Sequence, residues 1–305
     1  MRILWLTMDF DPRKVSGPYR HYYYTLETSI EKLADVVFYG RNEAESDVAK
    51  IVHETDPDVV MFYCDRSKWR NVDKVDIPKA YRCSDPWNYP AEKIEWVNKN
   101  NIDLVFHLLG AAVPEYQKRV KARCVEMFES VSSELFTNRG LDRVYDVFLT
   151  GAIDVPAYPL RNAIYQTYSR KPNCWVRAGS KSLPTVEDYV VKLNQSKVFP
   201  TGCCWHPMLG RTDLRFFLNK SLEAMGTETL LLMDVPTCAE SLHLVPDHNF
   251  VAITMRDFRK KIQYYLKNEE ERKQIAQRGR ETFLKYHTSA QRAKEVLEHL
   301  KRLVE

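Results

Sequence analysis

Short runs of apolar residues alternate with helical patterns along the whole chain of 305 residues. The runs are apolar nearly throughout, which is typical of strands that are buried on both faces of a parallel sheet. In the first half they are RILWLTM (2–8), DVVFYG (35–40), DVVMFYC (58–64), AYRCSD (80–85), IDLVFHL (102–108) and CVEMFE (124–129). The pattern therefore predicts an α/β protein.

A second series of apolar runs follows in the other half of the chain. It consists of YDVFLTGAI (145–153), CWVRAG (174–179), KVFPTGC (197–203), TLLLMDV (229–235) and FVAIT (250–254). A polar, turn-rich stretch at 132–143 separates the two series, and the chain is long enough for two hydrophobic cores. We therefore predict two Rossmann-like domains with parallel sheets, at 1–140 and 145–285.

The last segment, 288–305, predicts an amphipathic helix. Thr288 and Gln291 match a capping box at its start. One face carries the apolar residues Ala293, Val296, Leu297, Leu300, Leu303 and Val304. Such a continuous apolar face is expected to dock on another part of the protein.

The composition argues against several classes of protein. A formal net charge of +4 from 45 basic and 41 acidic residues is too balanced to indicate a nucleic-acid binder. Seven cysteines without CxxC spacing argue against a disulfide framework and a structural zinc site. No signal peptide and no apolar run of the roughly 20 residues that span a bilayer is present, so we expect a cytoplasmic protein.

The motifs of several enzyme classes are missing from the sequence. It contains no GxGxxG dinucleotide fingerprint, no GxxxxGK[ST] phosphate loop and no GxSxG nucleophile elbow. Candidate residues therefore come from the loops after the predicted strands, where open parallel sheets bind ligands. Asp11 and Gly17, in a Ser-Gly-Pro turn, follow the first strand.

Asp85 and His107 are the candidate catalytic residues. Asp85 precedes a proline, which favours an extended backbone, and a carboxylate there suits a general base for an acceptor hydroxyl. An ordinary Asp-Pro turn is the alternative. His107 ends the fifth strand and is placed to contact a sugar or phosphate, or else it is a satisfied core residue.

The candidate ligand-binding residues of the second half surround the stretch NKSLEAMGTETLLLMD (219–234). Asn219 is a predicted N-cap, which places Glu223 and Lys220 close to the start of a helix. Arg161 opens a helix and Arg211 precedes the Asn219 helix, so both arginines are candidates for a diphosphate, with a surface position as the alternative. Arg177 and His206 qualify by their place after predicted strands.

The carboxy-terminal half resembles the GT-B glycosyltransferases of the group 1 type, especially the spore-maturation-protein-like branch. The matching segments are YDVFLTGAIDVPAYPLR (145–161), NKSLEAMGTETLLLMD and the tail from DHNF to HTSAQRA (247–293). Arg215 stands where the family often has an acidic residue, eight positions before Glu223. The amino-terminal half matches no family residue by residue.

The resemblance implies a GT-B-like fold with two facing Rossmann-like domains and a last helix that crosses back to the first. It implies that Glu223 accepts hydrogen bonds from the ribose of a nucleotide sugar, expected to be a UDP-sugar, while the helix start faces the diphosphate. No metal is expected to be needed. The predicted activity is glycosyl transfer to an unidentified acceptor hydroxyl on a carbohydrate, a protein or a modified DNA base.

Two alternatives to this activity remain at the level of sequence. One is a non-catalytic GT-B module that binds a carbohydrate or nucleotide. The other is a glycosyltransferase that acts on hydroxymethylated pyrimidines in DNA, suggested by Arg66, Lys68 and Arg70 around Trp69, where a solvated loop is the competing interpretation.

Overall fold

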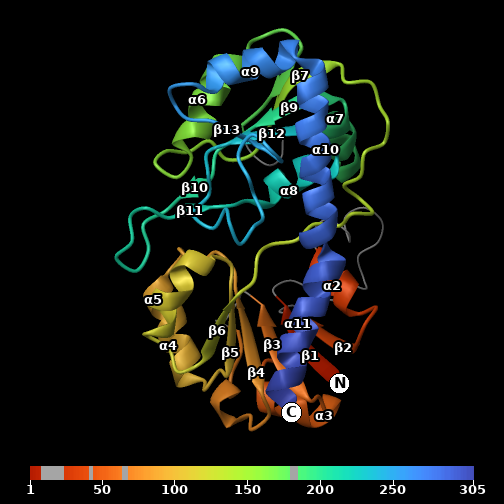
Figure 1. Cartoon of the computed structure of the whole chain (residues 1–305). Coiled ribbons are helices and arrows are strands. Elements are labelled where there is room, and N and C mark those ends of the chain that lie inside the picture. Colours follow the sequence, from red (N-terminus) through yellow and green to blue (C-terminus); the bar gives the residue numbers. More distant parts are fainter. Residues whose placement is uncertain (8–23, 41–43, 64–67, 179–184) are drawn as a thin grey trace. The chain divides into compact units, whose positions relative to one another are not determined.

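The computed structural model describes residues 1–7, 24–40, 44–63, 68–178 and 185–305. The chain forms two compact units. Figure 1 shows the chain coloured along its sequence, from red at the N-terminus to blue at the C-terminus. The first unit contains Met1–Phe128, Met208–Arg211 and Ser289–Glu305, and the second contains Glu129–Pro207 and Thr212–Thr288. The last helix of the chain is therefore part of the first unit.

A six-stranded parallel sheet forms the centre of the first unit, in the order β2-β1-β3-β4-β5-β6. Each strand coincides with one of the six apolar runs of the first half. The strands are β1 (Arg2–Thr7), β2 (Asp35–Gly40), β3 (Val59–Tyr63), β4 (Lys79–Cys83), β5 (Leu104–His107) and β6 (Arg123–Glu126). The α/β prediction is confirmed in this unit because these runs are buried on both faces.

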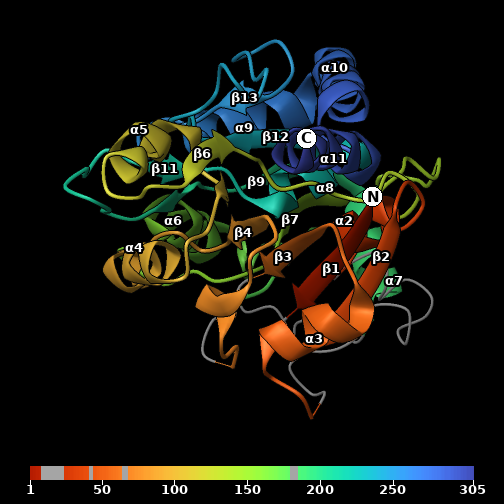
Figure 2. The ribbon, with the colours of Figure 1, turned by 90° about the horizontal axis from the view of Figure 1, so that it is seen from below.

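Helices cover both faces of this sheet, as Figure 2 shows. One face packs on α2 (Thr25–Ile30) and α11 (Ser289–Val304), whose Ala293, Val296, Leu297 and Leu300 are buried with strand residues such as Ile3 and Met61. The other face packs on α3 (Val48–Thr55), α4 (Pro90–Lys99) and α5 (Val113–Gln117). Short 3-10 turns lie at Val72–Lys74 and Gly110–Ala112. The apolar face of the last helix thus docks as its pattern predicted.

The second unit has a five-stranded parallel sheet in the order β13-β12-β9-β7-β8. Its strands are β7 (Tyr145–Leu149), β8 (Cys174–Val176), β9 (Ser196–Pro200), β12 (Leu230–Met233) and β13 (Val251–Ala252). The chain winds outward in opposite directions from β7 and β9. The carboxyl ends of these two strands are therefore the topological switch point, where open sheets of this kind bind ligands.

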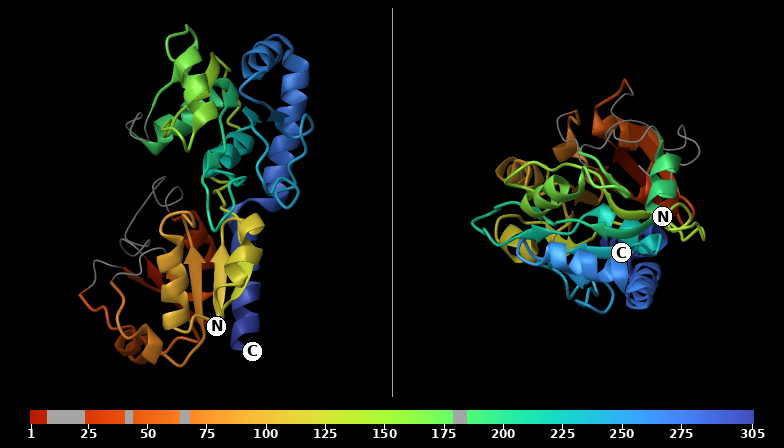
Figure 3. Two further views of the ribbon diagram at one scale, coloured as in Figure 1. Left: turned by 90° about the vertical axis from the view of Figure 1, so that its left-hand side faces the viewer. Right: turned by 90° about the horizontal axis from the view of Figure 1, so that it is seen from above.

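The helices of the second unit are α6 (Pro159–Tyr168), α7 (Val186–Asn194), α8 (Asn219–Gly226), α9 (Phe258–Lys267) and α10 (Glu269–Tyr286). Residues of α6, α9 and α10 share a core with one face of the sheet, including Ile164, Ile262 and Ile275. On the other face, Phe148 lies 5.7 Å from Tyr189 of α7 between ring centroids. Figure 3 shows α9 and α10 along one side of this unit.

A short hairpin was not predicted from the sequence. It pairs β10 (Cys204–Trp205) with β11 (Arg215–Phe216), and its turn has positive φ at Leu209 (51°) and Gly210 (81°). Two-residue strands carry too little apolar alternation to be recognised in a sequence.

Candidate functional site

Arg161 lies at the switch point of the second sheet. Its Nη1 donates to Ala152 O after β7 (3.0 Å), and its Nη2 donates to Gly202 O after β9 (3.2 Å). Nε donates to Thr201 Oγ1 at 3.1 Å, and the side chain is 2% exposed. Two of the five guanidinium N–H groups make no hydrogen bond to the described residues. Arg161 therefore mainly holds together the loops that follow β7 and β9.

Lys220, in the first turn of α8, lies next to the loop after β7. A Cβ added to Gly151 would lie 3.3 Å from both Lys220 Cε and Arg161 Nη1, and Gly151 has a φ of 113° that side chains rarely adopt. The ammonium lies 4.8 Å from the centroid of the Tyr189 ring. Among the described residues it has no hydrogen-bond or ion-pair partner. A half-buried cation thus remains available at the switch point.

Glu223 lies one turn further along α8 and is 4% exposed. The hydroxyl of Tyr189 donates a short hydrogen bond to its Oε2. Burial raises the pKa of Glu223 above its usual value, while Lys220 and the Tyr189 hydroxyl act in the opposite direction. Its Oε1 accepts no hydrogen bond from the part of the chain that the structure describes. A carboxylate oriented in this way can accept hydrogen bonds from ligand hydroxyl groups.

The predicted N-cap at Asn219 is wrong. The capping position is Leu218, whose backbone is extended (φ −117°, ψ 148°), and no side chain caps the helix. Asn219 is instead the exposed first residue of α8. The start of α8 therefore leaves its first backbone N–H groups without a side-chain cap, because leucine has no acceptor oxygen.

Asp234 follows β12 at the same edge of the sheet and was missed in the sequence. Its Oδ1 accepts a hydrogen bond from the Cys203 amide at 2.7 Å, and its Oδ2 lies 3.6 Å from Arg215 Nη1. Burial raises the pKa of Asp234, and the Cys203 amide and Arg215 partly counteract this. Its place after the apolar run TLLLM was the signal that could have selected it.

Three other candidates of the second half lie apart from this group of contacts. Arg211 belongs to the first unit, where its Nη1 donates to Ala111 O at 3.4 Å. Arg177 follows β8 as an exposed residue, and its Nη1 donates to Val176 O. His206 is half-buried and follows β10. The structure thus brings Arg161, Lys220 and Glu223 together, but neither Arg177 nor Arg211 joins them by a described contact.

In the first unit, Asp85 and His107 follow neighbouring strands, since Cys83 pairs with His107 across β4 and β5. The extended backbone predicted for Asp85 is wrong: its φ is 43°, in the left-handed region that aspartate tolerates, and its carbonyl accepts from Lys93 Nζ. His107 is 0% exposed, and its Nδ1 lies 3.0 Å from Leu109 O. Burial lowers the pKa of His107 to about 4.

The basic run around Trp69 does not form a stacking platform. Trp69 is 6% exposed and belongs to the core of the first unit, so its ring is not offered to a base. Lys68 Nζ donates to Gly40 O, and Arg70 Nε donates to Ser46 Oγ. Arg66, Asp11 and Gly17 lie outside the described residues.

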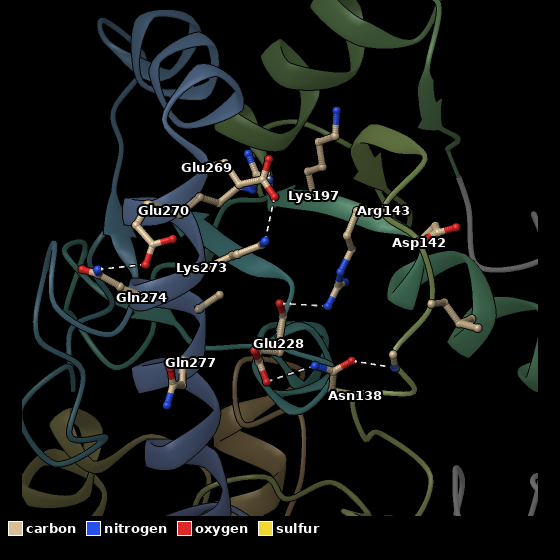
Figure 4. Close-up of a pocket in the computed structure, with 14 residues that line it drawn as sticks. Asn138, Asp142, Arg143, Lys197, Glu228, Glu269, Glu270, Lys273, Gln274 and Gln277 are labelled. Carbon is tan, nitrogen blue, oxygen red and sulfur yellow. Dashed lines mark hydrogen bonds and ion pairs between the residues drawn. The ribbon is translucent and has the colours of Figure 1, made fainter.

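A pocket of about 740 Å³ lies at the opposite, amino edge of the second sheet (Figure 4). Arg143 on its wall donates to carbonyl oxygens at the ends of two helices, Leu193 O of α7 and Thr227 O after α8. The lining contains four acidic and four basic residues, and two of the lysines are paired: Lys197 bonds to Asp146, and Lys273 to Glu269. This pocket therefore presents no concentrated charge of one sign to an anionic ligand.

Two further features are absent from the described residues. Residues 1–7, 24–40, 44–63, 68–178 and 185–305 contain no group of three or more His, Cys, Asp or Glu side chains arranged to hold a metal ion. Over the same ranges, every helix is too short or too polar to cross a lipid bilayer.

Comparison with known proteins agrees with this architecture. Residues 165–298 match the family described as Glycosyl transferase-like. No curated protein sequence matches the chain. Among solved structures, Alr3699/HepE from Anabaena is 12% identical, with a TM-score of 0.66 over 99% of this chain and 100% of its own. The chain has the GT-B fold.

Two further structures share this fold. Sucrose-phosphate synthase from Thermosynechococcus elongatus is 10% identical, with a TM-score of 0.68 over 99% of this chain and 98% of its own. A glycosyltransferase from Rickettsia africae is 10% identical, with a TM-score of 0.66 over 100% and 98% of the two chains. At these identities the likeness concerns the fold. The family match over residues 165–298 supports the predicted transferase activity.

Proposed function

We propose that this chain is a glycosyltransferase that moves a sugar from a UDP-sugar to an acceptor hydroxyl. The observation that carries the proposal is a pair of residues on α8, beside the switch point of the second sheet. They are the Lys220 ammonium, which is unpaired among the described residues, and the buried Glu223 carboxylate. The Anabaena protein of the same fold was crystallised with UDP and with UDP-glucose. Both ligands contain the groups that such a pair recognises, a diphosphate and a ribose.

Each residue of the pair has a separate role in this proposal. Glu223 accepts hydrogen bonds from the two ribose hydroxyls, with Tyr189 fixing the orientation of its carboxylate. Lys220 and the uncapped amides at the start of α8 bind the diphosphate and stabilise the negative charge that develops as UDP departs. Arg161 supports this arrangement by holding the loops after β7 and β9.

The acceptor is assigned to the first unit. Asp85, exposed after β4, is the proposed general base for the acceptor hydroxyl. His107 is fully buried, so we assign it to supporting the backbone at Leu109 rather than to contact with a sugar. The spore-maturation-protein-like subgroup and a cytoplasmic location remain parts of the proposal that rest on sequence.

A thermal-shift titration of the full chain with UDP, GDP, ADP and dTDP tests the donor assignment. UDP at 100 times its dissociation constant should stabilise the folded chain by about 2.7 kcal/mol, more than the other nucleotides do. Release of UDP from UDP-glucose, UDP-galactose or UDP-N-acetylglucosamine without acceptor then separates an enzyme from a binding module. The absence of any stabilisation by UDP would overturn the proposal.

A further inference from the structure

Asp234 is a half-buried carboxylate that the donor site described above does not yet use. The Cys203 amide holds its Oδ1 at 2.7 Å, so the orientation of the carboxylate is fixed by the backbone after β9. Its Oδ2 forms an ion pair with Arg215, whose Nη1 lies at 3.6 Å, too far for a hydrogen bond. The side chain is 18% exposed. One oriented acceptor oxygen is therefore left for another group.

A chain of close contacts connects Asp234 with the proposed nucleotide site. A Cβ added to Gly202 would lie 3.6 Å from Asp234 Oδ1 and 3.3 Å from the Arg161 amide nitrogen. Arg161 and Lys220 both lie against Gly151, and the Lys220 ammonium lies over the Tyr189 ring. Gly202, Arg161 and Gly151 thus connect Asp234 with Lys220.

The charge of Asp234 restricts what it can bind. A carboxylate repels a diphosphate, so it is unsuited to the anionic part of a nucleotide sugar, whereas it accepts hydrogen bonds from hydroxyl groups. Arg215, about half exposed, provides a neighbouring positive charge. A carboxylate that is removed from water needs such partners, and here Oδ1 accepts from the Cys203 amide while Oδ2 lies in an ion pair with Arg215.

We propose that Asp234 accepts a hydrogen bond from a hydroxyl of the transferred sugar, and thereby determines which UDP-sugars the enzyme uses. This inference rests on the proposed function, because it places the sugar next to Asp234 and the diphosphate next to Lys220. Asp234 is a specificity residue in this arrangement. Arg215 keeps the carboxylate in place by its charge.

The test compares Asp234→Asn with the wild type by calorimetry. The ligands are UDP, UDP-glucose, UDP-galactose and UDP-N-acetylglucosamine. Asparagine keeps an acceptor for the Cys203 amide but removes the charge, so UDP affinity should stay within about twofold. Affinity for the best UDP-sugar should fall about tenfold, because a hydrogen bond to a charged acceptor is lost. Asp154→Asn, an exposed residue after β7, is the matched control and should change neither affinity.

Two results would overturn the inference while leaving the proposed function intact. One is equal weakening of UDP and of every UDP-sugar in Asp234→Asn, and the other is no weakening of any of them. Monodeoxy derivatives of the best UDP-sugar give a second measurement on the wild type, which holds even if the variant folds poorly. At least one of them should bind about tenfold more weakly, and uniform binding would overturn the inference. Failure of the wild type to bind UDP would instead overturn the proposed function.

Discussion

The carboxyl edges of the two sheets carry polar residues in different environments. In the first unit, His107 is fully buried beside its own loop, and Asp85 lies in a left-handed turn held by Lys93. In the second unit, Lys220 is half-buried and unpaired among the described residues, and Glu223 is oriented by Tyr189. His107 is therefore held by its own loop, whereas Lys220, on α8 beside the second sheet, has no hydrogen-bond or ion-pair partner among the described residues.

The switch points explain part of this difference. In the first sheet, the chain reverses between β1 and β3, and the residues directly after these strands, 8–23 and 64–67, lie outside the described residues. Asp85 and His107 follow β4 and β5, away from that reversal. In the second sheet, Arg161 bridges the loops after β7 and β9, directly at the reversal. Distance from the switch point thus separates the two pairs of candidates.

Leu300→Ala should have the largest effect on stability, and this effect should be confined to the first unit. Leu300 is fully buried in the core that α11 shares with the first sheet, so the change should lower the free energy of unfolding of that unit by about 2 to 5 kcal/mol. UDP affinity, measured by calorimetry on the folded variant, should stay within twofold. Glu298→Ala, on the exposed side of α11, is the control. Unchanged stability in a denaturant titration would contradict the packing of this helix.

Glu223→Ala should weaken UDP binding by about tenfold or more, because hydrogen bonds to a charged acceptor contribute about 1.5 to 3 kcal/mol. Calorimetry measures the change, with the exposed Glu240→Ala as the control. Glu223→Gln should be at least as stable as the wild type at pH 8. The pKa of Glu223 is raised in the folded state, so ionisation above that pKa opposes folding and its removal stabilises. An unchanged UDP affinity in Glu223→Ala would rule out the ribose assignment.

Lys220→Met should weaken UDP by about fivefold, which corresponds to about 1 kcal/mol for a partly exposed charge pair. Uridine binding should not change, because the nucleoside lacks the diphosphate. The comparison of both ligands by calorimetry distinguishes a phosphate contact from a general structural effect, and Lys260→Met on α9 is the control. Equal losses for UDP and uridine would show that Lys220 acts through the structure.

His107 should stay neutral, and its ring should not titrate, across the neutral pH range. Its pKa in the folded chain is about 4, below the ordinary 6.5 of histidine, because burial disfavours the charged ring. Its NMR chemical shifts should therefore stay constant between pH 5 and 8. Stability should rise with pH between about 4 and 6.5, since the unfolded chain binds the additional proton in this range. A titration of His107 near pH 6.5 would show that the ring is exposed.

Much of the architecture could be predicted from the apolar runs. Among the described residues, all eleven strands of the two parallel sheets lie within or next to the predicted runs, because burial on both faces of a sheet requires uninterrupted apolar sequence. The docked last helix was predicted by the apolar face that includes Val296 and Leu300. The β10-β11 hairpin was not predicted from the sequence.

The α/β class, the parallel sheets, the final helix and the candidacy of Glu223 follow from periodicity and local motifs in the sequence. Which polar residues share a site depends on the tertiary fold. Tyr189 reaches Glu223 from 34 positions away, and Asp234 reaches Cys203 from 31 positions away. Such contacts depend on how helices and strand ends pack in three dimensions, and this packing leaves no trace in the spacing of either residue along the chain.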